Sequence, residues 1–219
     1  MAKRSQASGF VNKLTDEDLV EIYRHMRTED MTSEEGREYI LEEYCPDELE
    51  GEEEQSKFVE GVWRKIFVNN EKQPGSSGII PMAIRTVAQT GPFLSMADAL
   101  TSLTWQQLQE KAQDNPQLQS HIETINAAAT KQKVSPEKCW KESMLGLTKR
   151  AEKRRPALAY AQKIMAACDV SEEGNYWTPG RGSKNIMAAA FRQEESAGIN
   201  LATLGRLFQD LSGSDTTEE

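Results

Sequence analysis

The stretch Phe58-Val-Glu-Gly-Val-Trp-Arg-Lys-Ile-Phe67 decides the fold class, because its apolar residues recur at spacings of three and four. On a helix of 3.6 residues per turn, that spacing forms one continuous apolar stripe. Similar patterns occur at about residues 15–28 and along much of the chain up to about residue 211. No long alternating strand pattern and no repeat of fixed period is present. We therefore expect an all-α protein of about ten short helices in two lobes, with no significant β-sheet.

Local signals mark where the expected helices begin and end. Thr15, Thr32 and Thr104 each precede Asp, Glu or Gln by three positions, which is typical of a capping box. Gly91-Pro92 predicts the end of a mostly buried helix that starts near residue 79. Pro156 predicts either a kink in a basic helix or the start of an alanine-rich one.

Composition divides the 219 residues into five segments. The stretch Glu71-Lys-Gln-Pro-Gly-Ser-Ser-Gly78 combines turn formers with small polar residues, which is typical of a linker. Residues 1–60 hold 7 cations and 18 acidic residues, a net charge of −11 in a chain whose total is −9. The expected segments are a flexible N-terminal arm (1–13), an acidic helical lobe (14–70), the linker (71–78), a main helical domain (79–211) and a disordered tail (212–219).

Other features of the composition exclude several classes of protein. No apolar run approaches the 18 or more residues that a membrane helix needs, so we expect no membrane partner. The three cysteines are odd in number, far apart and outside any CxxC motif, which indicates free thiols. We therefore expect a cytoplasmic location or another reducing intracellular compartment, and a place in a virion is a further alternative.

The stretch from Lys131 to Lys163 has a net positive charge, unlike the whole chain, because it contains ten cations and three acidic residues. The densest part of this run contains Lys149, Arg150, Lys153, Arg154 and Arg155. The first four fall at spacings of one, three and four and so share a helix face. Phosphate backbones bind such faces by charge neutralisation. The alternative is a solvated helix face whose charge the acidic lobe balances.

A second candidate site is Gly180-Arg-Gly-Ser-Lys184, which spans the end of an expected loop at residues 169–182 and the start of the following helix. Ser183 predicts the N-cap of a helix at residues 184–196, and the N–H groups of a helix start bind anions together with Arg181 and Lys184. Tyr176 and Trp177 would stack on unpaired bases beside this anion site. The alternative is a capped helix whose loop is anchored by a buried tryptophan.

The apolar stripe itself has two interpretations. On a lobe of about 70 residues it is by default the core. It could also dock on a neighbouring copy of the chain, with Phe58, Trp63 and Phe67 as the self-assembly residues.

Patterns of catalytic residues are absent. No nucleophile motif, zinc-binding HExxH motif or dinucleotide-binding glycine pattern occurs, so we expect no enzymatic activity and no cofactor. Glu21, His25 and Glu29 share a helix face and could hold a metal ion. Glutamate is so abundant in this segment that coincidence is the better explanation, and we expect no metal.

Together these patterns favour a non-enzymatic helical protein that binds nucleic acid and assembles with copies of itself, as a nucleocapsid or coat-type packaging protein does. Its expected partners are a nucleic acid, single-stranded rather than double-stranded, and other copies of the chain. The alternative is a protein–protein adaptor or regulator whose acidic N-terminal lobe captures a basic partner. The total charge of −9 opposes the binding of a polyanion at long range.

Overall fold

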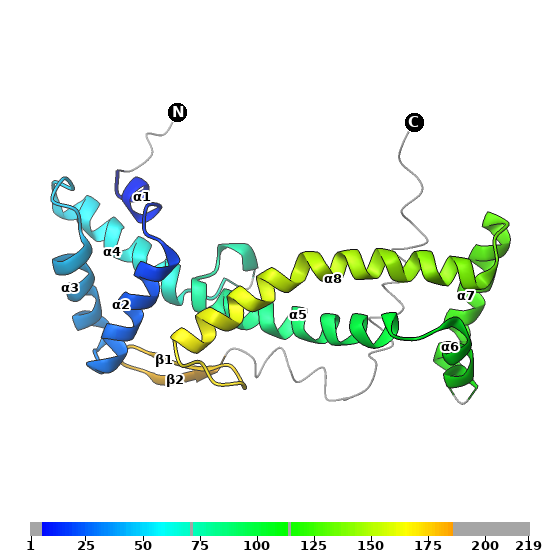
Figure 1. The fold of residues 1–219 in the computed structure, drawn as a ribbon. Coiled ribbons are helices and arrows are strands. Elements are labelled where there is room, and N and C mark those ends of the chain that lie inside the picture. Colours follow the sequence, from blue (N-terminus) through cyan, green and yellow to red (C-terminus); the bar gives the residue numbers. More distant parts are fainter. Residues whose placement is uncertain (1–5, 71, 114, 186–219) are drawn as a thin grey trace. The chain divides into compact units, whose positions relative to one another are not determined.

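The computed structural model describes residues 6–70, 72–113 and 115–185 (Figure 1). The described residues form eight α-helices, one short 3-10 helix and one two-stranded sheet, so the expected all-α class is confirmed. They divide into two compact units, the first made of residues 6–88 and 159–185 and the second of residues 89–158. The segment expected as a linker, residues 71–78, lies within the first unit, and a 3-10 helix occupies Pro74–Ser76.

The first unit is built from helices and one hairpin. Its elements are α1 (Gln6–Val11), α2 (Asp16–Thr28), α3 (Ser33–Tyr44), α4 (Glu52–Phe67), the first part of α5 (Ile79–Thr101), the last part of α8 (Pro136–Ala167), β1 (Asn175–Thr178) and β2 (Gly182–Asn185). The expected capping boxes start α2 and α3. The Thr15 hydroxyl accepts from the Asp18 backbone N–H at 3.2 Å, and the Asp18 carboxylate accepts from the Thr15 backbone N–H at 2.7 Å. Thr32 and Glu35 repeat this arrangement, which lowers the pKa of Glu35 because its carboxylate accepts the Thr32 N–H.

The core of the first unit forms where α4 meets α2 and α3. The stripe on α4 is buried, as are four residues on the facing side of α2: Leu19, Ile22, Tyr23 and Met26. Gly36 allows α3 to approach closely, because a Cβ atom there would lie 2.7 Å from Met26 Sδ and 3.3 Å from Trp63 Cζ3. Both distances are shorter than ordinary van der Waals contacts, so a side chain at this position would require the Met26 side chain or α3 to shift.

Part of the expected flexible arm is instead an ordered helix. Residues 6–11 form α1, whose Ala7 and Val11 are buried in the first core. Lys65 Nζ on α4 donates a hydrogen bond to the Val11 carbonyl oxygen at 2.7 Å. The segment is too short to show helical periodicity in the sequence, and its order comes from packing on α4. Residues 1–5 lie outside the described part of the chain.

The second unit contains the rest of α5, α6 (Trp105–Ala112), α7 (Pro116–Gln132) and the first part of α8. Thr104 and Gln107 form the expected capping box at the start of α6. Trp140 is buried and its Nε1 donates to the Leu103 carbonyl oxygen at 3.3 Å. The core of this unit consists of Phe93, Leu94, Met96, Ala97, Leu100, Leu108, Ala112, Leu118, Ile125, Ala129, Cys139, Trp140, Met144, Leu147 and Ala151.

The predicted end of a helix at Gly91-Pro92 is wrong, because α5 continues through Pro92. Of the two alternatives at Pro156, the start of a new helix is wrong, because α8 continues through this proline. Both proline rings are exposed, so solvent can hydrate the carbonyl that each proline leaves without a donor. Buried apolar residues on both sides of each proline, such as Ile84 and Phe93 in α5, hold the helix together. The helices are consequently longer than expected.

The expected helix start at Ser183 is also wrong. Residues 182–185 form β2, which pairs antiparallel with β1 in the register Asn175↔Asn185 to Thr178↔Gly182. Gly180 and Gly182 have φ values of +66° and +65°, which glycine adopts readily and which reverse the chain direction here. The rest of that expected helix, the following helix at about residues 200–211 and the expected disordered tail lie outside the described residues. No described helix is both long and apolar enough to cross a lipid bilayer.

Candidate functional site

Three cations of the basic run on α8 form neither an ion pair nor an aromatic contact with a described residue, and we call these three, Lys149, Arg150 and Lys153, the α8 face. Lys149 and Lys153 are exposed and Arg150 is half-buried. Leu147 and Ala151, which are buried, lie two residues to either side of Lys149. Two residues correspond to about 200° around a helix, so Lys149 lies opposite the buried stripe. None of the three cations forms an ion pair with a described acidic residue.

The other two predicted cations of this run are held by α5. The Arg154 guanidinium lies over the Phe93 ring, with 4.2 Å between Cζ and the ring centroid. Arg155 forms an ion pair with Asp98. Stacking leaves the charge of Arg154 in place, whereas the carboxylate of Asp98 neutralises that of Arg155. The five predicted phosphate-binding residues of this run therefore divide into three cations with neither an ion pair nor an aromatic contact, one stacked cation and one neutralised cation.

Cations nearer the start of α8 are compensated on the helix itself. Lys141 pairs with Glu137 at 2.7 Å, and Lys138 lies 3.9 Å from Glu142. Both are pairs at i and i+4, which contribute little to stability at an exposed position but cancel charge locally. Residues 89–158 hold ten cations and seven acidic residues, a net charge of +3. Lys149, Arg150 and Lys153 carry part of the charge that no described carboxylate compensates.

Tyr176 and Trp177 anchor the hairpin. Tyr176 is 2% exposed, because alternation along β1 points it into the core, and burial raises its pKa to about 12. Its predicted role of stacking on a base is therefore wrong. Trp177 is half-buried: its Nε1 donates to Asp30 Oδ1 at 3.1 Å, and its ring lies edge-on to Tyr23 at 6.0 Å. These contacts match the alternative of a tryptophan that fastens its loop.

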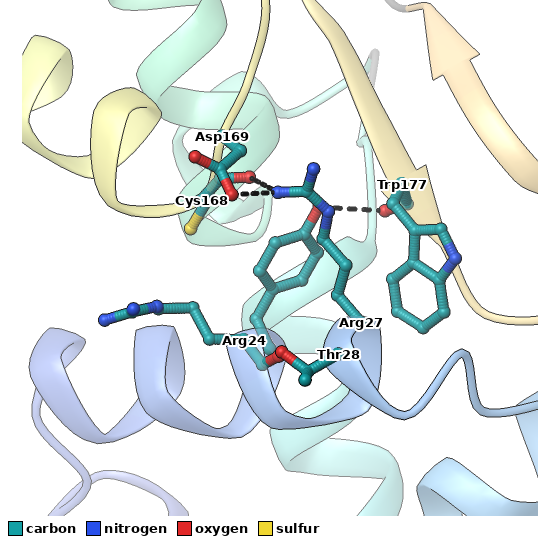
Figure 2. Close-up of polar contacts among 7 residues, drawn as sticks. Arg24, Arg27, Thr28, Cys168, Asp169 and Trp177 are labelled. Atoms are coloured by element: carbon teal, nitrogen blue, oxygen red, sulfur yellow. Dashed lines mark hydrogen bonds and ion pairs between the residues drawn. The ribbon is translucent and has the colours of Figure 1, made fainter.

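Figure 2 shows how the segment after α8 is held against α2. The Tyr23 hydroxyl donates to the Trp177 carbonyl oxygen at 3.2 Å. Arg27 Nη1 donates to the Cys168 carbonyl oxygen at 3.3 Å and pairs with the Asp169 carboxylate at 2.5 Å. Because these contacts join residues far apart in the sequence, they fix the position of the hairpin within the first unit.

The anchored hairpin borders a groove of about 540 Å³ in the first unit, which we call the hairpin groove. Arg181 and Lys184 contribute to it from the hairpin, and both are exposed. Trp63 and Phe67 contribute from α4, and Arg37 from α3. The complete lining is Ser33, Arg37, Trp63, Phe67, Val68, Asn69, Thr178, Pro179, Arg181, Lys184 and Asn185. It contains three cations and no carboxylate.

The groove joins residues that the sequence assigned to two different roles. Trp63 and Phe67 were expected to be self-assembly residues together with Phe58, whereas Arg181 and Lys184 were expected to bind phosphate. Phe58 and Phe67 are 1% and 7% exposed, so their role in self-assembly is wrong and they belong to the core. Only Trp63 of this set is partly accessible. Arg37 was missed, since nothing in the local sequence shows that α3 packs it over α4.

Metal-binding and thiol chemistry find no support in the described residues. No group of three or more potential metal ligands occurs there, and His25 stacks on Tyr39 with 4.3 Å between ring centroids. Cys139 and Cys168 are buried free thiols, and burial raises the pKa of Cys168 to about 12. A thiol of such high pKa is a poor nucleophile.

Comparison of the chain with protein-family models, with curated proteins and with solved structures gives no match. The function is therefore argued from the sites alone.

Proposed function

We propose that the protein binds the phosphate backbone of nucleic acid through the α8 face and packages the nucleic acid together with further copies of itself. The observation that supports this proposal most directly is the set of three neighbouring cations without acidic partners in the described chain. Unpaired cations on an exposed helix contribute little to the stability of the fold. They favour binding of nucleic acid, because counterions are released when the cations neutralise phosphates.

The size of the α8 face favours weak binding by each copy. Neutralising three phosphates of a single strand corresponds to a slope of about −2 in a plot of log affinity against log salt concentration. The total charge of −9 reduces the affinity further by repelling the strand at long range. A site of this kind becomes effective when neighbouring copies bind side by side on one strand, because cooperativity then adds to each weak contact. Weak single sites are consistent with a packaging role.

Binding of a labelled single-stranded oligonucleotide across a salt series tests the proposal. Lys149→Gln/Lys153→Gln should weaken binding and make the slope shallower by about 1.4, because two phosphate contacts are lost. The matched control is Lys138→Gln/Lys141→Gln, which removes the same charge from the same helix at positions already paired with Glu142 and Glu137. Equal effects of the two double variants, or no binding by the unaltered protein at low salt, would contradict the proposal. Light scattering on the same samples should show large particles only when the oligonucleotide is bound.

A second candidate function, a protein–protein adaptor, is favoured by the acidic surface of the first unit. Residues 1–88 and 159–192 hold fifteen cations and twenty-two acidic residues, a net charge of −7. The acidic residues at 42–54 are mostly exposed, and among those described only Glu53 and Glu54 form ion pairs, both with Lys57. Tight binding of a polylysine peptide that Glu42→Gln/Glu43→Gln/Glu48→Gln abolishes, with no oligonucleotide binding, would favour the adaptor.

A further inference from the structure

We propose that the hairpin groove holds one unpaired nucleotide of the bound strand, with its base stacked on Arg37 and its phosphate between Arg181 and Lys184. This inference rests on the proposed function, because it names the part of the nucleic acid that the first unit recognises. It makes unpaired nucleotides the specific ligand, whereas the α8 face binds phosphates of any sequence or strandedness.

Arg37 is a preorganised stacking platform. Its Cζ lies 4.1 Å from the centroid of the Trp63 ring, so the guanidinium is supported from one side by an aromatic surface. Its Nε donates to Glu60 Oε1 at 2.6 Å and its Nη1 donates to the Ser33 carbonyl oxygen at 3.0 Å. The side chain is nevertheless 36% exposed. Unstacked bases stack on planar guanidinium groups, and a side chain that is already held in place loses little entropy when they do.

The hairpin supplies the anion-binding part of the groove. Arg181 and Lys184 are exposed and form no ion pair with a carboxylate in the described ranges. The backbone between them is open, because a Cβ atom at Gly182 would meet no atom within 4 Å. A phosphate can therefore approach the main chain of the turn as well as both side chains.

Hydrogen-bonding groups lie along the same lining. Asn69 Oδ1 accepts from Arg85 Nη2 at 2.6 Å, which fixes the amide and leaves its Nδ2 group without a partner among the described residues. The Ser33 hydroxyl donates to the Pro179 carbonyl oxygen at 3.0 Å, which joins α3 to the hairpin at the edge of the groove. Fixed polar groups beside a stacking surface are the usual arrangement in pockets that orient a base.

Charge and size select a single-stranded ligand. Glu60 compensates Arg37, so Arg181 and Lys184 leave the groove with about two uncompensated positive charges, whereas residues 1–88 and 159–192 together carry a net charge of −7. The acidic surface repels a polyanion at long range, whereas the groove lining, which contains no carboxylate, attracts it. A volume of about 540 Å³ falls in the range of small-molecule pockets, which suits one nucleotide and is too small for a duplex.

The test compares a normal single-stranded oligonucleotide with one of equal length that lacks its bases. Arg37→Lys keeps the charge but removes the planar group, so it should lower affinity for the normal strand about five- to tenfold and leave the salt slope unchanged. It should leave affinity for the abasic strand unaltered. Arg64→Lys, at an exposed arginine of α4 outside the groove, is the matched control and should bind both strands as the unaltered protein does.

The phosphate contacts are tested separately. Arg181→Gln/Lys184→Gln should weaken binding of both strands and make the salt slope shallower by about 1.4, because two cations are lost. Lys13→Gln/Lys72→Gln removes the same charge from exposed positions of the first unit outside the groove and should have little effect. Circular dichroism of each variant controls for correct folding.

The outcomes separate the two proposals. The proposed function is overturned if the unaltered protein does not bind the oligonucleotide, or if Lys149→Gln/Lys153→Gln binds it as tightly as the unaltered protein does. Binding that depends on the α8 face but does not discriminate between normal and abasic strands, and does not respond to the groove variants, overturns only the nucleotide pocket. Loss of strand discrimination in Arg37→Lys together with the shallower slope in Arg181→Gln/Lys184→Gln supports it.

Discussion

At the residue scale, two buried tyrosines of the same core differ in their hydrogen bonding. The Tyr23 hydroxyl donates to the Trp177 carbonyl oxygen at 3.2 Å, whereas the Tyr176 hydroxyl is buried with no hydrogen-bond partner among the described residues. A buried hydroxyl without a partner loses its hydration without compensation, and one with a partner contributes about 1 kcal/mol net.

We therefore expect opposite effects when each hydroxyl is removed. Tyr23→Phe should lower the free energy of unfolding by about 1 kcal/mol, because the Trp177 carbonyl also loses its donor. Tyr176→Phe should leave the stability unchanged or raise it. Urea unfolding monitored by circular dichroism measures both, and each variant is the other's control because both remove one oxygen from a buried ring. A larger loss of stability in Tyr176→Phe than in Tyr23→Phe would contradict this interpretation.

At the scale of single elements, the sequence predicts best what local interactions determine. The capping boxes at Thr15, Thr32 and Thr104 and the stripe on α4 depend only on residues a few positions apart, and all of them are present. The sequence does not predict that α5 passes through Pro92, and at Pro156 it does not decide between a kinked helix and a new one, because distant residues stabilise the helix on both sides of each proline. The hairpin was missed for a different reason: strands of four residues are too short to show alternation.

The residues of the candidate site also differ in whether the sequence alone predicts them. Its charged residues, Arg181 and Lys184, stand out in the sequence, as do the cations of the α8 face. The contact of Arg37 with Trp63 depends on how α3 packs against α4, and the burial of Tyr176 depends on the register of the hairpin. Neither has a local signal. The sequence therefore identified the cations of the site but not its stacking surface.

The docking of α1 on α4 gives a prediction at this scale. A Cβ atom at Gly61 would lie 2.8 Å from Val11 Cγ2, and the stiff, β-branched valine cannot move aside easily. Gly61→Ala should therefore release α1, even though alanine favours the helical conformation of α4. Hydrogen–deuterium exchange should become faster in residues 6–13 and remain unchanged in the rest of α4.

Gly9→Ala is the matched control for this displacement. A Cβ atom at Gly9 would meet nothing within 4 Å, so the same substitution should only strengthen α1 and slow its exchange. Equal exchange rates in residues 6–13 of both variants would show that close packing of Val11 on Gly61 does not hold α1 in place.

At the scale of the whole molecule, the two cores differ in their titratable groups. Tyr23, Tyr176 and Cys168 are buried in the first core, where burial raises the pKa of Tyr23 and raises those of Tyr176 and Cys168 to about 12. The second core contains no tyrosine, and of its residues only Cys139 has a pKa that burial raises. Alkaline conditions should therefore act mainly on the first unit.

The sign of this effect follows from the protons that each state binds. In the unfolded chain, cysteine loses its proton near pH 8.5 and tyrosine near pH 10, about three and a half and two pH units below the values near 12 of the buried Cys168 and Tyr176. Between those values the folded state holds more protons, so stability is fully present below about pH 8.5 and is lost as the pH rises towards 12. The same argument predicts no comparable loss near neutral pH, since all three groups are then protonated in both states.

Hydrogen–deuterium exchange under alkaline conditions, corrected for the intrinsic rate at each pH, measures this difference between the units. Residues 6–88 and 159–185 should lose protection before residues 89–158 do. Above pH 10 the free energy of unfolding of the first unit should fall less steeply in Tyr176→Phe than in the unaltered protein. The two slopes should differ by about 1.4 kcal/mol per pH unit, because the variant releases one proton fewer on unfolding. Simultaneous loss of protection in both units, or an unaltered slope in Tyr176→Phe, would mean that the buried phenols and thiol of the first core do not govern its alkaline stability.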